Sequence, residues 1–160
     1  MPPPSRPMAT DNHRKGIETA RRVVNECLAG RIRLLSRLVT GRYDAELKEH
    51  GLTANQVTIL AVVAMLEKTT PTDMQPYLMM DASTISRNVA RMIENHWLGT
   101  IPAEDRRSHF LIVAPGGFEV LANAAPAWER AHAWAEELFG ERGTAAIREL
   151  SHAVNPLVPL

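Results

Sequence analysis

The stretch DASTISRNVARMIE, residues 81–94, decides the fold because it has the pattern of a helix with two unlike sides. Its apolar residues recur at i, i+4, i+7 and i+8, which is the spacing of one helix face. The other side holds short hydroxyls, an amide and two guanidinium groups, with no carboxylate between residues 82 and 92. We therefore expect one side to be buried and the other to be open to a partner. The apolar set is Ile85, Val89, Met92 and Ile93, and the polar set is Ser83, Thr84, Ser86, Arg87, Asn88 and Arg91.

Two helices are expected before this stretch. Residues 52–68, LTANQVTILAVVAMLEK, are apolar on nearly all sides and begin with a T-x-x-Q capping box made by Thr53 and Gln56. The segment TPTDMQPYL predicts a short helix, with a second capping box at Thr72 and Gln75. The order of a short helix, a turn and a two-sided helix is typical of a helix-turn-helix.

A hairpin is expected after the two-sided helix. Asp81 suits the N-cap of that helix, and Gly99 and Pro102 mark a break beyond its end. Residues 100–113, TIPAEDRRSHFLIV, then have the pattern of two short strands around a charged tip. Such a hairpin would be the wing of a winged helix-turn-helix, which we place at about residues 53–114.

Long helices are expected at both ends of the chain. One runs from about Asn12 to Glu49, with a kink expected at Gly30 or Gly41. Another begins at Pro115, and a short helix spans residues 144–154. The expected apolar stripe of the helix at Pro115 consists of Phe118, Leu121, Ala125, Trp128, Ala135 and Leu138.

These elements predict a mainly α fold with a small β-wing. The winged helix-turn-helix lobe is too small to cover the apolar stripes of the end helices, at about residues 13–50 and 115–160. A second copy would cover them, at about 25 cal/mol per Å² of buried apolar surface, so we expect a homodimer. We expect a proline-rich, disordered tail over residues 1–12 and a single domain over residues 13–160.

Composition limits the class of protein. The chain has 160 residues with 18 basic and 18 acidic side chains, so any basic surface must be local. One cysteine excludes an internal disulfide framework. No apolar run of 18 residues occurs, and the start MPPPSRPMATDNHRKG lacks the apolar region of a secretory signal. We expect a soluble cytoplasmic protein without a membrane partner.

The polar side of residues 81–94 has the chemistry of a reader of double-stranded DNA. Arginine can pair with the O6 and N7 of guanine, and asparagine with the N6 and N7 of adenine. Serine and threonine are compact enough to let the helix enter the major groove and to bond phosphates. At the wing tip, Arg106 and Arg107 could enter a narrow minor groove, with Asp105 as a brace for one of them. A solvated face is the usual reading of a polar helix side, but the order of the elements and the lack of acids favour DNA.

The same residues resemble the MarR family of winged-helix transcriptional regulators. The resemblance covers residues 17–154 and lies in CLAGRIRLLSRLVTGRYDAELKEHGLTANQVTILAVV, STISRNVARMIENHWL and EDRRSHFLIV. Asp105 and Arg107 match the Asp-x-Arg motif of the family's wing, and its recognition-helix pattern falls on Ser83, Thr84, Ser86 and Arg87. The resemblance implies an obligate homodimer on a pseudo-palindromic operator, joined through its end helices. It also implies release by a small-molecule effector, often a phenolic or aromatic acid.

Three departures from the family pattern stand near the DNA-reading elements. Pro76 interrupts a helix, His96-Trp97 replaces an Arg/Lys-Gly pair before the wing, and Ala114-Pro115 replaces Leu-Thr. None removes a DNA-contacting residue type. The first two are expected to affect the tilt of the recognition helix.

Other residues allow additional roles. Cys27 could make the chain a thiol-based redox sensor, with Arg31 one turn away, although an inert buried thiol is commoner. Arg33 and Trp128 are candidate contacts for an aromatic acid effector. Several methionines could line an adaptable pocket, although methionine more often fills a core. These are Met65, Met74, Met79, Met80 and Met92.

Catalysis, cofactors and metals have no positive signal in the sequence. The G-x-S-x-G elbow, the P-loop, the dinucleotide fingerprint and H-E-x-x-H are all missing. The six histidines form no i, i+4 pair. We therefore expect a transcriptional regulator, such as a repressor, and not an enzyme. The alternative is a protein–protein adaptor that keeps the winged-helix shape without binding DNA.

Overall fold

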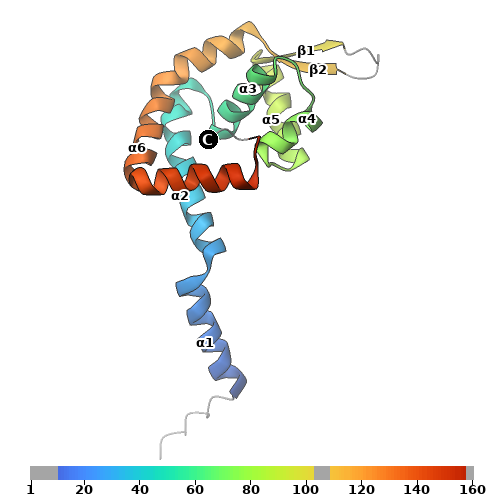
Figure 1. Cartoon of the computed structure of the whole chain (residues 1–160). Coiled ribbons are helices and arrows are strands. Elements are labelled where there is room, and N and C mark those ends of the chain that lie inside the picture. The colour runs from blue at the N-terminus through green and yellow to red at the C-terminus, as the bar shows by residue number, and fades with distance from the viewer. Residues whose placement is uncertain (1–10, 103–108, 158–160) are drawn as a thin grey trace, which may run out of the picture. The chain divides into compact units, whose positions relative to one another are not determined.

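A computed structural model describes residues 11–102 and 109–157 of the chain (Figure 1). The chain divides into two compact units, residues 1–39 and 40–160, which are considered separately. The predicted fold class, mainly helical with a small β-hairpin, is confirmed. The elements are α1 Asp11–Glu26, α2 Leu28–Leu47, the 3-10 helix η1 Lys48–His50, α3 Ala54–Leu66, α4 Pro71–Leu78, α5 Ala82–Glu94, β1 Leu98–Pro102, β2 His109–Val113 and α6 Pro115–Val154.

The first unit contains α1 and the beginning of α2. The kink predicted at Gly30 or Gly41 is wrong, because both glycines lie inside α2 and the helix is interrupted at Cys27. At the interruption the Asn25 carbonyl accepts a hydrogen bond from the Arg31 guanidinium. No backbone N–H of the described residues donates to this carbonyl. Arg31 thus satisfies a carbonyl at the end of a helix, which a glycine pattern could not reveal.

The second unit is built around a winged-helix lobe, which we define as α3, α4, α5 and the hairpin of β1 and β2. The capping box at Thr53 and Gln56 is confirmed, because each side chain accepts from the backbone N–H of the other residue. Helix α3 buries Ile59, Leu60 and Val63 in the middle of the lobe. Figure 1 shows α3 beside α4 and α5, the two helices of the helix-turn-helix.

Helix α4 begins two residues earlier than its predicted capping box requires. Thr70, not Thr72, is the N-cap, and its hydroxyl accepts from the Asp73 N–H and donates to the Asp73 carboxylate. Pro71 explains the difference, since proline is favoured at the first helical position, where no N–H is needed. Pro76 therefore lies in the second turn of α4, inside the helix.

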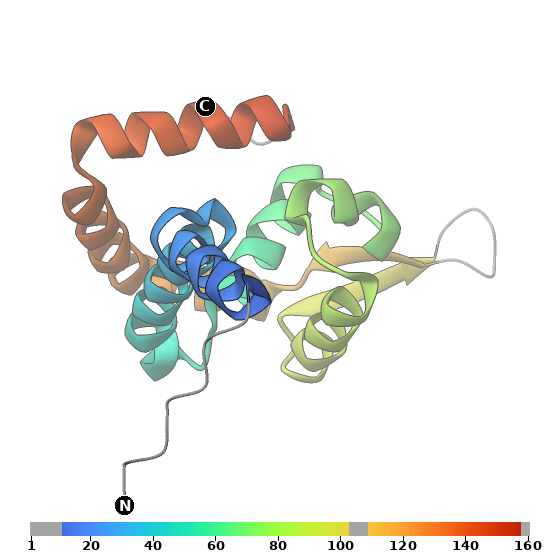
Figure 2. The same cartoon turned by 90° about the horizontal axis from the view of Figure 1, so that it is seen from below.

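The hairpin follows α5 after a tight turn. The chain turns at His96, which has φ 58°, and the predicted break at Gly99 and Pro102 is wrong because both residues lie in β1. Strands β1 and β2 pair antiparallel from Leu98↔Val113 to Pro102↔His109. Figures 1 and 2 show the hairpin projecting from the three helices of the lobe, beside α5, which is the position of a wing.

Helix α6 begins close against the turn before the wing. A Cβ on Gly117 would lie 2.1 Å from the carbonyl oxygen of Trp97, so only glycine fits there. The helix changes direction at Gly140, whose φ of 64° and ψ of 173° suit glycine. The predicted short helix at residues 144–154 is thus the second half of α6. Among the described residues no helix is long and apolar enough to cross a membrane.

The buried side of α6 differs from the predicted stripe. Of the predicted stripe, Ala135 is buried, but Phe118, Trp128 and Leu138 are exposed. Small side chains let a helix approach its neighbours closely, and Ala124 and Ala127 belong to the core of the lobe, while Phe118, Trp128 and Leu138 are left exposed. The buried residues of α6 are Gly117, Ala124, Ala127, Ala131 and Ala135.

Candidate nucleic-acid interface

The N-terminus of α5 is organised by the Asp81 carboxylate. The carboxylate accepts three hydrogen bonds, from the Thr84 N–H at 2.8 Å, from the Thr84 hydroxyl at 2.7 Å and from the Ser83 hydroxyl. The Ser83 bond and then the Thr84 bonds hold the pKa of Asp81 well below its usual range, with a smaller contribution from the Arg87 charge. The predicted N-cap is confirmed. The two hydroxyls predicted to meet DNA are thereby fixed in direction.

Arg87 is the best-positioned guanidinium on the exposed side of α5. Its Nη2 donates to the Thr84 hydroxyl oxygen at 3.1 Å, so Asp81, Thr84 and Arg87 form one hydrogen-bonded chain along the helix surface. The rest of the exposed guanidinium can still donate to a partner, because one arginine carries five N–H groups. Restricting this side chain before binding lowers the entropy lost when it meets a base.

The remaining predicted contacts fall into two groups. Ser86 and Arg91 are exposed, and within the described part of the chain neither forms a side-chain hydrogen bond or ion pair. Asn88 is half-buried, and its Nδ2 donates to the Thr84 carbonyl of its own helix at 2.9 Å. This bond uses one of the two N–H groups of Asn88 and ties the amide to its own helix, while the other N–H and Oδ1 are left to pair with adenine. The arginines are therefore better placed than Asn88 to read a base.

The opposite side of α5 holds the helix in place. Ile85, Val89 and Met92 are buried as predicted, whereas Ile93 is 36% exposed and the prediction for it is wrong. Leu78 of α4 and Leu98 of β1 belong to the same core. The rigid attachment of one side leaves the other as a fixed surface.

One cation that the sequence did not indicate lies beside the wing. The Lys68 ammonium lies 5.4 Å from the centre of the Phe110 ring of β2, a cation–π contact. Thr69, next to Lys68, pairs with Leu111 of β2 by two backbone hydrogen bonds. This pairing spans residues far apart in the chain, so no local pattern could reveal it. The predicted wing residues Asp105, Arg106 and Arg107 lie outside the described residues.

A cavity of about 330 Å³ lies between α3 and α6, beside Trp128. The indole stacks on His132 with 4.8 Å between ring centres, and the Tyr43 hydroxyl lies 3.1 Å from His132 Nδ1. Burial and then the Glu136 charge raise the pKa of Tyr43. Arg33 belongs to the first unit and is not among the lining residues. The cavity is lined by Val57, Thr58, Ala61, Leu121, Ala124, Ala125 and Trp128.

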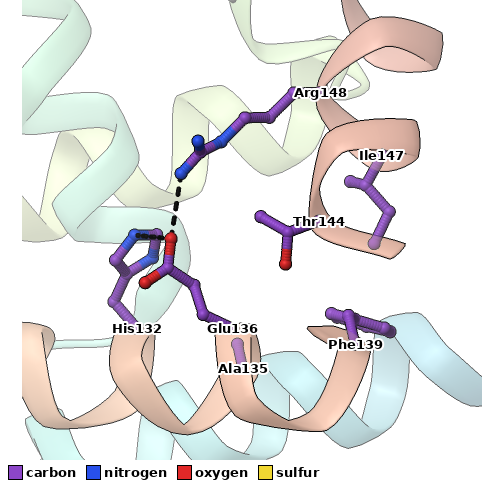
Figure 3. Close-up of a pocket in the computed structure, with 7 residues that line it drawn as sticks. All are labelled: His132, Ala135, Glu136, Phe139, Thr144, Ile147 and Arg148. Atoms are coloured by element: carbon purple, nitrogen blue, oxygen red, sulfur yellow. Dashed lines mark hydrogen bonds and ion pairs between the residues drawn. The ribbon is translucent and has the colours of Figure 1, made fainter. Parts of the chain in front are cut away.

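A smaller cavity of about 150 Å³ lies on the inner side of the α6 bend (Figure 3). Glu136 is paired with Arg148 at 3.0 Å and lies 3.5 Å from His132, so the charges at this wall are already matched. The buried Thr144 hydroxyl has no hydrogen-bond partner among the described residues. The other walls are apolar and belong to Ala135, Phe139 and Ile147.

The methionines do not gather in one place. Met74 and Met92 are fully buried in the core, whereas Met65 and Met79 are mostly exposed. No group of three or more potential metal ligands occurs in the described ranges. Cys27 is half-exposed, and its neighbour Arg31 donates to the Asn25 carbonyl.

Comparison with known proteins supports this arrangement. A family model described as a winged helix DNA-binding domain matches residues 52–117. The HTH-type transcriptional regulator YwoH of Bacillus subtilis is 27% identical over 90 residues, a match that covers 56% of this chain and 66% of YwoH. The chain thus spans slightly less than two thirds of that relative.

Solved structures share the fold over most of the chain. An E. coli MarR mutant complexed with operator DNA is 17% identical, with a TM-score of 0.73 over 83% of this chain and 96% of that chain. The MosR regulator of M. tuberculosis in complex with DNA is 25% identical, with a TM-score of 0.69 over 82% of this chain and 98% of that chain. Bordetella bronchiseptica BpsR, whose DNA binding is regulated by 6-hydroxynicotinic acid, is 17% identical, with a TM-score of 0.73 over 81% of this chain and 93% of that chain. Residues 52–117 of the chain are therefore similar to winged helix DNA-binding domains, and the chain shares the fold of the MarR regulators, as the resemblance in its sequence implied.

Proposed function

We propose that this protein is a transcriptional regulator that reads operator DNA through the exposed side of α5. The observation that carries the proposal is the Asp81–Thr84–Arg87 chain on a helix whose opposite side is locked in the core. The relatives MarR and MosR, described in complexes with DNA, support it. Arg87 is the residue expected to read a base, most simply guanine, while Ser86 and Arg91 contact the groove or the phosphates.

The wing is expected to add minor-groove contacts. Strand β1 begins at Leu98, four residues after α5 ends at Glu94, and pairs with β2, so the hairpin follows directly on the proposed reading helix. Between the two strands, Arg106 and Arg107 carry the charges that a narrow minor groove attracts, and Asp105 is the expected brace. Lys68 adds a positive charge beside strand β2 of the wing, where a phosphate could be contacted.

A homodimer is the proposed form on DNA. Large apolar side chains are exposed in both units, including Val24 at 81% and Leu150 at 67%. Exposure on this scale marks a surface that is covered by a partner. A two-fold pair of lobes would place two α5 helices on half-sites about 10 bp apart, on a pseudo-palindromic operator.

Release by a small effector is the proposed regulation. The cavity beside Trp128 lies between α3 of the lobe and α6, so a bound molecule would contact both elements. Its volume of about 330 Å³ and its apolar walls suit a small aromatic molecule. The effector would act by binding more tightly to a form in which the two α5 helices no longer match adjacent grooves.

The test is a selection from a random duplex library near physiological salt, with wild type and Arg87→Ala in parallel. A palindrome enriched by wild type, with one position per half-site relaxed in the variant and affinity reduced by about 1–3 kcal/mol, is expected. Arg142→Ala removes the same charge from an exposed position of α6 and should keep the wild-type preference. If a folded dimer enriches no sequence at any salt concentration, either alone or with small aromatic acids added as effectors, the protein is an adaptor and the proposal fails.

A further inference from the structure

The C-terminal end of α6 contacts the helix-turn-helix within the same unit. The Nδ2 of Asn155, the residue that follows α6, donates to the carbonyl oxygen of Pro76 in α4 at 2.6 Å. Asn155 is only 9% exposed. In Figures 1 and 2 the red end of α6 lies next to α4, in agreement with this bond.

The Pro76 carbonyl needs an external donor. The last carbonyls of a helix have no partner in their own helix. Helix α4 ends at Leu78, and the Met79 N–H donates a hydrogen bond to the Gln75 carbonyl. No backbone N–H of the described residues donates to the Pro76 carbonyl. The Asn155 amide fills this position from 79 residues away in the chain.

Asn155 is itself fixed on several sides. Its backbone N–H donates to the Ser151 carbonyl at 2.9 Å, and its Oδ1 accepts from the Leu157 N–H at 3.2 Å. An amide held in this way has one direction in which to donate. The Asn155 amide therefore links the position of the α4 end to the position of the α6 end.

Helix α4 is poorly held by its own backbone. It has eight residues, and Pro76 removes one of the few N–H groups that could bond within it. Met79, in the left-handed region with φ 49°, then leads into the Asp81 cap of α5. A movement of the α4 end is therefore passed directly to the N-terminus of α5.

We infer that Asn155 is a positioning residue for DNA reading, which clamps the end of α4 from α6 and so fixes the direction of α5. The inference rests on the proposed function. It gives a role to three features at once: Pro76 inside α4, the bend at Gly140 that returns α6 to the lobe, and the buried amide at the chain's end. Any event that changes the bend of α6 would reach the reading helix through this one hydrogen bond.

The test compares Asn155→Asp with wild type on the operator selected by wild type. The variant has the same size but places an acceptor against the Pro76 carbonyl. Affinity for the operator should fall about 10-fold, while affinity for random duplex should change less than about 2-fold, as expected for a lost bond to a positioned group. Hydrogen exchange at the Met79 amide should accelerate, while exchange in α3 should not change.

Two further variants separate the loss of the Asn155 hydrogen bond from the effect of an added charge and from a general effect of substitution. Asn155→Ala removes the donor without adding charge and should show a smaller loss, and it carries the test if the Asp variant does not fold. Ser151→Ala, one turn earlier, removes only the bond from its hydroxyl to the Arg148 carbonyl and should match wild type. Equal operator affinity and equal Met79 exchange in wild type and both Asn155 variants would overturn the inference. If wild type selects no operator, the proposed function fails instead, and Met79 exchange still reports whether the clamp exists.

Discussion

Helices α5 and α6 differ in the size of the side chains that they bury. In α5 the large side chains Ile85, Val89 and Met92 are buried, and the exposed side is polar. In α6 the buried residues are one glycine and four alanines, and many large apolar side chains are exposed, with Leu150 67% exposed and Val154 76% exposed. The apolar side of α5 is covered within one chain, whereas α6 has apolar surface that one chain does not cover.

The difference fits the two roles proposed for these helices, DNA reading for α5 and association of two copies for α6. A helix that presents a fixed polar surface must be anchored by large residues, because each buried side chain contributes roughly 1.5–3 kcal/mol. In α6 the buried residues are small, and the large exposed ones are available to the proposed second copy. Substitutions in α5 should therefore affect folding, and matched substitutions on the outer side of α6 should affect association.

The largest expected effect is loss of stability from the buried side of α5. Met92→Ala should lower the free energy of unfolding by about 2–5 kcal/mol, because Met92 is fully buried and its loss leaves a cavity. Denaturant unfolding at fixed protein concentration measures this change. Met79→Ala is the matched control, since Met79 is 71% exposed, and should change stability little. Similar losses in both variants would contradict the assigned core.

Next in size is loss of association from the outer side of α6. Leu150→Glu should convert the dimer to a folded monomer and weaken operator binding by about 100-fold, because two half-sites are no longer bound together. Molar mass in solution and circular dichroism separate association from folding. Ala145→Glu adds the same charge on the opposite side of this part of α6, where Ala145 is exposed, and should remain dimeric. A dimeric Leu150→Glu protein would show that this side of α6 is not the interface.

The smallest effect concerns the cap of α5 and its dependence on pH. The folded-state pKa of Asp81 lies below its usual range, first because of the Ser83 and Thr84 bonds, so its charge stabilises the fold above the unfolded pKa of about 3.9. This contribution is lost as pH falls through the lower folded pKa. The difference in Tm between wild type and Asp81→Asn should be constant from about pH 7 to about pH 5 and should shrink below about pH 4. A difference that grows on acidification would exclude this origin.

Much of the second unit is predictable from local patterns. The Thr53–Gln56 box, the Asp81 cap and Pro115 at a helix start are short-range features, because each depends on residues within one helical turn. The buried face of α5 follows from helical periodicity. For this reason the amino-acid pattern alone is enough to predict the fold class and most of the exposed residues of the candidate site.

The features that local patterns predict wrongly have identifiable physical causes. The spacing of Thr72 and Gln75 predicts a cap at Thr72, but Pro71 favours Thr70 as the cap of α4. Hydrophobic size, the usual sign of burial, predicts that the large residues of α6 face the core. In α6 the alanines are buried instead, and only the shape of the lobe decides which side faces it.

The sequence by itself determined the type and order of the elements, most of their caps and the polar side of α5, because those depend on neighbours within a few residues. Only the tertiary structure decided that Asn155 meets Pro76, that Tyr43 meets His132 and that Lys68 lies over Phe110. Each of these contacts joins residues at least 42 positions apart in the chain. Their geometry is fixed by the packing of whole helices, which no local spacing encodes.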